Sequence, residues 1–128
     1  MEFPKELLYS EDHEWVRDEG GQVTVGITDY AQSQLRDIVY VDLPETGSEY
    51  KKGESMGVVE SVKTVADIFS PVTGKVIEKN LSLRDHPEYI NTDPYGKGWL
   101  LRMELREREE LNGLLSAEAY QGKLSEES

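Results

Sequence analysis

The chain has no cysteine and only two histidines among its 128 residues. The absence of thiols excludes a disulfide framework, a thiol nucleophile, an iron–sulfur cluster and any zinc site with cysteine ligands. Because His13 and His86 do not stand in an HExxH arrangement, the spacing also argues against a histidine-based metal site or catalytic triad. The sequence therefore offers few of the side chains that an enzyme needs.

Basic residues are also scarce, since 14 lysines and arginines stand against 26 aspartates and glutamates and give a formal net charge of −12. A nucleic-acid-binding surface needs basic patches that neutralise phosphates, so this balance argues against one. No apolar run comes near the ~20 residues that a membrane-spanning helix requires. Residues 1–6 carry charged side chains and no apolar core, so we expect neither a signal nor a transit peptide, and a cytoplasmic location.

Short β-type segments, separated by glycine and proline turns, make up most of the chain. A length of 128 residues fits one domain, and a chain of this size buries enough surface to fold without covalent cross-links. Apolar patterning predicts strands at 22–27, 38–43, 75–78 and 99–105, and a long turn at 91–98. Many short strands at even spacing favour an antiparallel sandwich or barrel.

Helix signals are few. Thr28 can cap a short helix over residues 29–35, with Asp29 placed near the positive end of its dipole. Beyond Glu107 the composition favours two short helices packed on the β body. Residues 121–128 are expected to form a mobile tail, so we place the core of a single domain at about 9–120.

The strand-like run 56–70 contains 15 residues, which is too long for one strand of the usual ~5–6 residues. The residue pattern alone favours a break at Gly57 or Asp67. A break at the middle, at Val62 and Lys63, would bring residues 61 and 64 opposite each other and leave Lys63 at the exposed tip of a hairpin. Neither of these two residues is Gly, Asn or Asp, so turn propensity does not support that break.

The segment ESVK at 60–63, followed by PVTG at 71–74, resembles the lipoyl-lysine segment of glycine cleavage system H proteins. Four further blocks look like that family's blocks in the family's order: HEWV at 13–16, VGITDYAQ at 25–32, LPETG at 43–47 and NTDPYGKGW at 91–99. The resemblance spans about residues 9–120. Biotin domains typically have Met-Lys-Met and other lipoyl domains Asp-Lys-Ala around the lysine, whereas this chain has Val62-Lys63-Thr64.

The resemblance implies a flattened β-barrel, a barrel-sandwich hybrid of two antiparallel sheets, with lipoic acid attached to the Lys63 amine. It implies a carrier that catalyses no step. A pyridoxal-phosphate glycine decarboxylase loads the aminomethyl group of glycine onto the arm, and a tetrahydrofolate-dependent aminomethyltransferase removes it. A dihydrolipoyl dehydrogenase containing FAD reoxidises the dithiol, and a lipoate ligase or lipoyltransferase attaches the cofactor. A lone lysine in a hairpin is usually only a solvated charge, so this interpretation depends on the surrounding blocks.

Two residues near the lysine are implied to guide its modification. Glu60 lies three residues before Lys63, and Gly74 lies eleven residues after it, at positions that matter to lipoylation in this family. Glu60 offers a charged side chain that the modifying enzyme can contact. The plainer interpretation of Gly74 is a turn residue with positive φ.

The resemblance also nominates Glu14 and Asp67, with Asp12, as carboxylates of a cleft that holds the cationic, loaded arm and excludes water. The plainer interpretation is that these three are surface acids among the 26 of the chain. His13, which lies beside them in the sequence, is expected to be a packed or capping histidine rather than a catalyst.

The chain departs from the family at two positions. Arg36 stands where glycine is usual, and if that residue needs positive φ, arginine costs about 1 kcal/mol or more. Lys79 adds a base where an apolar residue is usual. Two alternative functions stay open at this point: a paralogous lipoyl carrier or lipoate donor for another pathway, and an acidic adaptor that is never modified.

Overall fold

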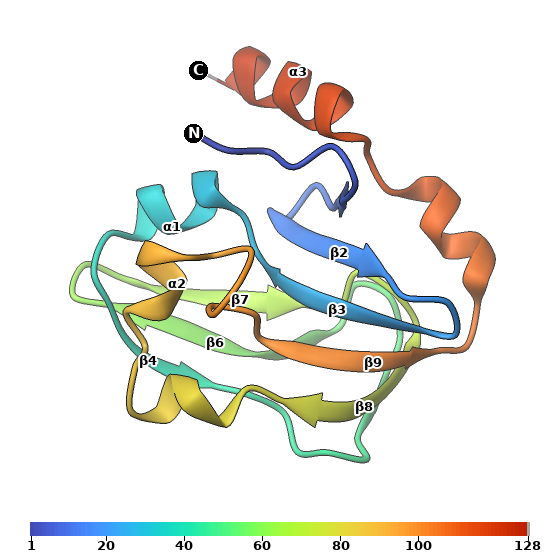
Figure 1. The fold of residues 1–128 in the computed structure, drawn as a ribbon, viewed down its shortest axis with the longest axis horizontal. Coiled ribbons are helices and arrows are strands. Elements are labelled where there is room, and N and C mark those ends of the chain that lie inside the picture. The colour runs from blue at the N-terminus through green and yellow to red at the C-terminus, as the bar shows by residue number, and fades with distance from the viewer. Residues whose placement is uncertain (128) are drawn as a thin grey trace.

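A computed structural model describes residues 1–127, whose strands form two antiparallel sheets (Figure 1). The strands are β1 (Leu8–Tyr9), β2 (Glu14–Asp18), β3 (Gln22–Ile27), β4 (Ile38–Asp42), β5 (Glu49–Tyr50), β6 (Ser55–Ser61), β7 (Val65–Phe69), β8 (Gly74–Lys79) and β9 (Leu101–Leu105). The helices are α1 (Asp29–Leu35), the 3-10 helix η1 (Leu81–Arg84), α2 (Tyr89–Thr92), the 3-10 helix η2 (Arg108–Gly113) and α3 (Ala117–Glu127). The expected mainly β fold with short helices is confirmed.

The larger sheet has the order β1-β2-β3-β9-β8-β5 and the smaller sheet the order β4-β6-β7. One hydrophobic core lies between them, because inward-facing side chains of both sheets join it, among them Val25, Val59, Ile68 and Val76. Each of these four is at most 1% exposed. The alternation that predicted the strands thus turns one face of each sheet toward this core, although in β3 the other face is largely buried as well.

A second, smaller core lies beneath α3, which runs alongside the N-terminal segment in Figure 1. It is rich in aromatic side chains and contains Leu7, Tyr9, Trp15, Ala117 and Tyr120. The tryptophan is fully buried, and its indole N–H donates to the Pro94 carbonyl at 3.0 Å. This core attaches both ends of the described chain to the larger sheet.

The run 56–70 divides into β6 and β7 at the residues between 61 and 64, as the break at its middle predicted. The Ser61 amide donates to the Thr64 carbonyl at 2.8 Å, and the ladder continues with Glu60 opposite Val65. The two alternative break points lie inside strands, Gly57 in β6 and Asp67 in β7, so neither alternative is correct.

Two expectations need correction. Residues 91–92, expected to open a long turn, are the last residues of α2, and neither α2 nor η1 was predicted. β9 begins at Leu101 rather than 99, because the Trp99 carbonyl accepts a side-chain hydrogen bond from Asn80. The segment expected to form a mobile tail belongs to α3 as far as residue 127, and Leu124 packs against the second core; its mobility stays a prediction, and residue 128 lies outside the described residues.

Helix α1 begins and ends with specific side chains. The Thr28 hydroxyl accepts the Ala31 amide at 3.2 Å, which confirms the predicted cap. At the other end Arg36 has φ 70° and ψ −149°, a conformation that is almost restricted to glycine. Its amide donates to the Gln32 carbonyl, and its carbonyl accepts from the Asn91 side chain at 2.8 Å. The surrounding contacts hold arginine where glycine is usual.

We expect Arg36→Gly to raise the free energy of unfolding by about 1 kcal/mol, because relief of backbone strain exceeds the entropy that glycine adds to the unfolded chain. Urea denaturation measures the change. Arg36→Ala removes the same side chain but keeps a Cβ atom, so its stability should stay near that of the parent. An equal gain in both variants would assign the effect to the arginine side chain instead of its backbone.

Candidate functional site

The Lys63 turn, at the left edge of Figure 1 beside α1, is held by one side chain. The amides of Lys63 and Thr64 both donate to Ser61 Oγ, at 3.2 and 3.0 Å. A hydroxyl that accepts backbone donors one turn ahead stabilises a turn without glycine or asparagine. Sequence reasoning missed this role of Ser61 in holding the turn, and the signal was a serine directly before the two central residues.

A second contact anchors the turn from outside the hairpin. The Val62 amide donates to the Asp37 carbonyl at 3.0 Å, so the turn is attached to the loop between α1 and β4. The Val62 side chain is 70% exposed, and Lys63 is also exposed. Lys63 Nζ lies 3.5 Å from the Gln34 carbonyl on α1. The lysine stem therefore extends over the last turn of this helix.

A cleft of about 280 Å³ opens at this point between α1 and the small sheet. Its lining residues are Asp12, His13, Glu14, Ile27, Tyr30, Ala31, Gln34, Leu35, Val59, Ala66 and Asp67. Since Gln34 belongs to this lining and its carbonyl lies beside Lys63 Nζ, the lysine amine stands at the edge of the cleft.

The structure brings together the three acids that the sequence nominated for a cleft. Glu14, Asp67 and Asp12 all line it, although they differ in burial: Glu14 is 1% exposed, whereas the other two are exposed. The Ser55 hydroxyl donates to Asp67 Oδ1 at 3.2 Å. The cleft thus has apolar walls and a group of carboxyls, the arrangement that a hydrocarbon chain with a cationic end requires.

Glu14 joins the two sheets. Its Oε1 lies 2.6 Å from Ser10 Oγ, and its Oε2 accepts the Phe69 amide of β7 at 3.2 Å. Burial raises the pKa of Glu14 to about 8, and the charge of Asp12 adds to the rise, while the bonds from Ser10 and Phe69 oppose it. The Glu14 carboxyl group is therefore largely protonated at neutral pH in the absence of a cation.

Glu60 and Gly74 do not line the cleft. Glu60 is exposed on the outer face of the small sheet, between Tyr40 on β4 and Val65 on β7. Gly74 is the first residue of β8, so the whole length of β7 separates it from the lysine turn.

The expectation of positive φ at Gly74 is wrong, since this residue is not among the glycines with positive φ. Any Cβ atom at this position would instead collide with the backbone carbonyl oxygen of Glu104 on β9. Glycine is required here because two backbones approach closely.

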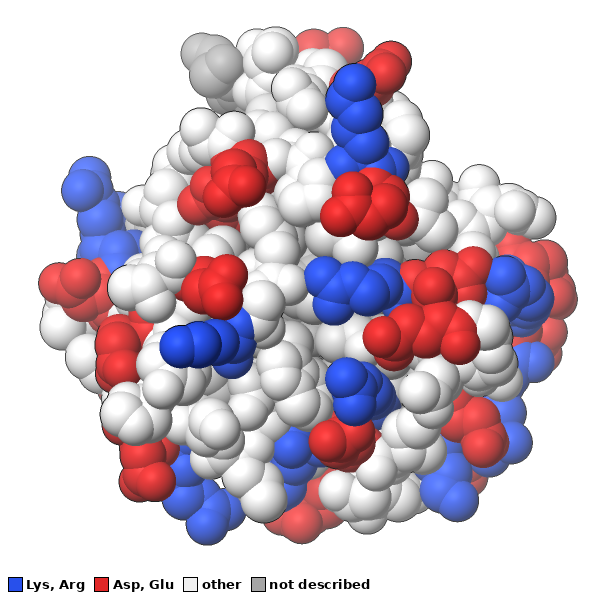
Figure 2. Space-filling model, in the orientation of Figure 1, with Lys and Arg blue, Asp and Glu red and all other residues white. Residues whose placement is uncertain are grey.

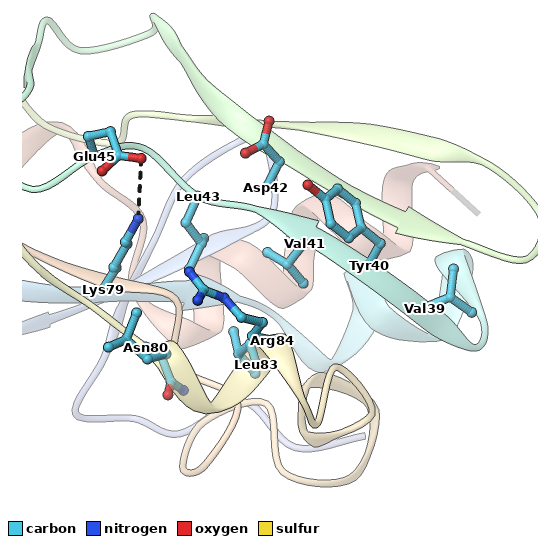
Figure 3. Close-up of a pocket in the computed structure, with 11 residues that line it drawn as sticks. Val39, Tyr40, Val41, Asp42, Leu43, Glu45, Lys79, Asn80, Leu83 and Arg84 are labelled. Atoms are coloured by element: carbon cyan, nitrogen blue, oxygen red, sulfur yellow. Dashed lines mark ion pairs between the residues drawn. The ribbon is translucent and has the colours of Figure 1, made fainter.

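Another hollow, of about 200 Å³, lies between β4 and the β8–η1 segment (Figure 3). Lys79, the base that departs from the family, extends toward Glu45 in the segment after β4, and its Nζ lies 3.6 Å from Glu45 Oε1. None of the nominated site residues lines this hollow.

Within residues 1–127, no cluster of three acids or histidines is arranged to hold a metal ion. No helix of that part of the chain is long and apolar enough to cross a membrane.

Comparisons with known proteins agree with this geometry. The family model described as Glycine cleavage H-protein matches residues 7–127. The glycine cleavage system H protein of Geobacillus sp. (strain WCH70) is 52% identical over 126 residues, which cover 98% of this chain and 99% of the relative. That of Thermus thermophilus is 52% identical over 128 residues and covers 100% of both chains.

The same relationship holds for a solved structure. The crystal structure of a glycine cleavage system H protein from Mycobacterium marinum has a TM-score of 0.84 to this chain at 40% sequence identity, and the match covers 96% of this chain and 99% of that one. The family model and the relatives together define a carrier protein rather than an enzyme. The chain belongs to the glycine cleavage H-protein family. It is a lipoyl carrier of glycine cleavage and not itself a catalyst.

The buried Glu14 carboxyl makes the stability of the fold depend on pH. Its pKa is about 8 in the folded protein against an ordinary 4.5, so between these values the folded state keeps a proton that the unfolded state releases. The free energy of unfolding should therefore fall as pH rises from about 5 to about 8. In Glu14→Gln this fall should be largely absent, since the amide can donate to Ser10 and accept from Phe69 without titrating.

Urea denaturation at several pH values measures this dependence for the parent and for Glu14→Gln. Glu118→Gln, which changes an exposed acid on α3, serves as the control and should keep the parent's dependence. If the parent and Glu14→Gln lose stability in parallel over this range, Glu14 is not protonated in the folded state.

Proposed function

We propose that the lipoyl group of this carrier is attached to Lys63 and is held, when loaded, in the cleft beside α1. The position of the Lys63 amine carries the proposal, because Nζ stands 3.5 Å from a carbonyl of the cleft lining. In this proposal the carrier receives the aminomethyl group from the glycine decarboxylase, delivers it to the aminomethyltransferase and is reoxidised by dihydrolipoyl dehydrogenase. The cytoplasmic location expected from the sequence stays a prediction.

The residues of the cleft fit such a group. Ile27, Ala31, Leu35, Val59 and Ala66 provide an apolar lining for a hydrocarbon chain. When attached, the lipoyl group supplies a redox-active disulfide, which the cysteine-free chain lacks. Since no protein thiol is present, none competes for that disulfide.

Each chain residue then has a physical role. Lys63 provides an exposed amine on a long stem, and Ser61 fixes the backbone that carries it. Asp67 provides a carboxylate for a cationic amine in the cleft. A cation beside Glu14 favours the ionised form of its carboxyl group, so the proton leaves as the positive charge arrives.

Glu60 and Gly74 support the modification in different ways. Glu60 presents an exposed carboxylate on the face that also carries the lysine turn, where a lipoate ligase or lipoyltransferase can contact it. Gly74 contributes through the fold, because its close approach to Glu104 sets the pairing of β8 with β9.

Lipoylation is tested by the intact mass of the protein after incubation with lipoate, ATP and a lipoate ligase. The parent should gain one lipoyl increment, and Lys63→Arg should gain none, because the guanidinium does not replace the amine as a nucleophile. Glu60→Ala should fold normally but be modified more slowly than the parent, whereas the exposed-acid control Glu118→Ala should be modified at the parent's rate. A mass gain in Lys63→Arg would place the attachment elsewhere.

The cleft is tested by the lifetime of the aminomethyl-loaded carrier in buffer, followed by mass spectrometry. Asp67→Asn and Glu14→Gln should each shorten that lifetime, since either change removes a negative charge from the bound amine. Asp42→Asn is the matched control, because Asp42 lies on the same small sheet but does not line the cleft. Equal lifetimes in all four proteins would contradict the assignment of the carboxyls.

A further inference from the structure

Tyr120 of α3 belongs to the second core but also has contacts outside it. The ring is 1% exposed and stacks on the Tyr9 ring, with centroids 4.8 Å apart and an interplanar angle of 9°. Phe3 packs edge-on against the same ring at 5.6 Å. These contacts explain why an aromatic ring is needed at this position. They do not explain why the ring carries a hydroxyl group.

The Tyr120 hydroxyl lies between two polar groups from other elements. Its oxygen lies 2.8 Å from His13 Nδ1 and 2.7 Å from the Thr28 hydroxyl. These partners are 107 and 92 residues away along the chain. A backbone bond from the Thr28 amide to the His13 carbonyl, at 3.0 Å, completes a closed group of three residues.

Of these two residues, His13 lines the cleft, and Thr28 caps a helix that lines it. Thr28 is fully buried and caps the first turn of α1, the helix that supplies Tyr30, Ala31 and Gln34 to the lining. His13 lines the cleft directly, and its ring packs on the Tyr30 ring at 5.0 Å. The packed interpretation of His13 thus agrees with its contacts.

The His13 backbone has φ 71°, a conformation that side-chain-bearing residues rarely adopt. Such a conformation persists only where surrounding contacts hold it. The hydrogen bond between the imidazole and the Tyr120 hydroxyl is one of those contacts.

We propose that Tyr120 is a positioning residue for the cleft: its hydroxyl fixes His13 and the start of α1, so the C-terminal helix sets how closely the cleft encloses the loaded arm. This inference rests on the proposed function, since it assumes that the arm occupies this cleft. Tyr120 does not line the cleft and so acts through His13 and Thr28.

The test compares two tyrosine hydroxyls in one stacked pair. Tyr120→Phe keeps the ring and removes the hydroxyl that contacts the cleft wall. Tyr9→Phe is the matched control, because it removes a hydroxyl from the partner ring whose hydrogen bond goes instead to the Pro4 carbonyl at 2.7 Å. Both variants, in the full chain, are lipoylated, loaded with the aminomethyl group, and followed by mass spectrometry as the group is lost.

We expect the loaded form of Tyr120→Phe to decay about fivefold faster than that of the parent. Fivefold is about the factor by which the loss of one hydrogen bond changes an equilibrium constant, here the one between the closed and the loosened cleft. The loaded form of Tyr9→Phe should decay at the parent's rate. Equal decay of all three proteins would overturn the positioning role while leaving the carrier function intact. Failure of the parent to take up lipoate or the aminomethyl group would instead count against the proposed function.

A second measurement does not require the arm. The chain has only two histidines, and His86 is exposed beyond η1, where it contacts Glu88 at 3.0 Å. In proton NMR spectra of the unmodified protein, the His13 ring resonances should move in Tyr120→Phe, while those of His86 should not. His13 resonances that stay unchanged in Tyr120→Phe would show that the hydroxyl does not hold this ring, and would refute the inference whatever the loading experiments gave.

Discussion

The register of β6 against β7 determines which side chains enter the core and where the hairpin turns. Val59 and Ile68 face inward and are each 1% exposed, whereas Glu60 and Asp67 are exposed. Because side chains alternate along a strand, a slip of either strand by one residue would expose its apolar residue and bury its acid. Exposing each apolar side chain alone costs about 1.5–3 kcal/mol. The position of Lys63 at the tip follows from this packing constraint, not from turn propensity.

Much of the fold was predictable from sequence because the strands alternate regularly, as at 22–27, and because Thr28 is a strong helix cap. The lysine turn was harder, since its stability comes from the side chain of Ser61 rather than from its central residues. The family resemblance nominated the cleft acids, but it did not indicate that Glu14 is buried and joins the two sheets. Contacts between residues more than 90 positions apart in the sequence, such as those of Tyr120, produce no local sequence pattern from which they could be predicted.

Although the net charge is −12, acidic side chains do not cover the molecular surface uniformly. On the face in Figure 2, lysine and arginine side chains lie among the aspartates and glutamates, and no field of one sign covers it. Surface ion pairs occur in the protein, such as Arg102 with Glu78 at 2.7 Å. Such pairs contribute little to stability, and a partner that meets this face interacts with local charges rather than with one acidic surface.

The hydrogen bonds that hold the lysine turn have an entropic consequence. Fixing the backbone of one residue costs about 1–2 kcal/mol of conformational entropy. In this turn the amides of Val62, Lys63 and Thr64 are all bonded within the protein, so that ordering occurs during folding. An enzyme that binds here meets a preorganised backbone and needs to immobilise only the lysine stem. The motional freedom of anything attached to Lys63 is accordingly that of the side chain, while the point of attachment stays fixed.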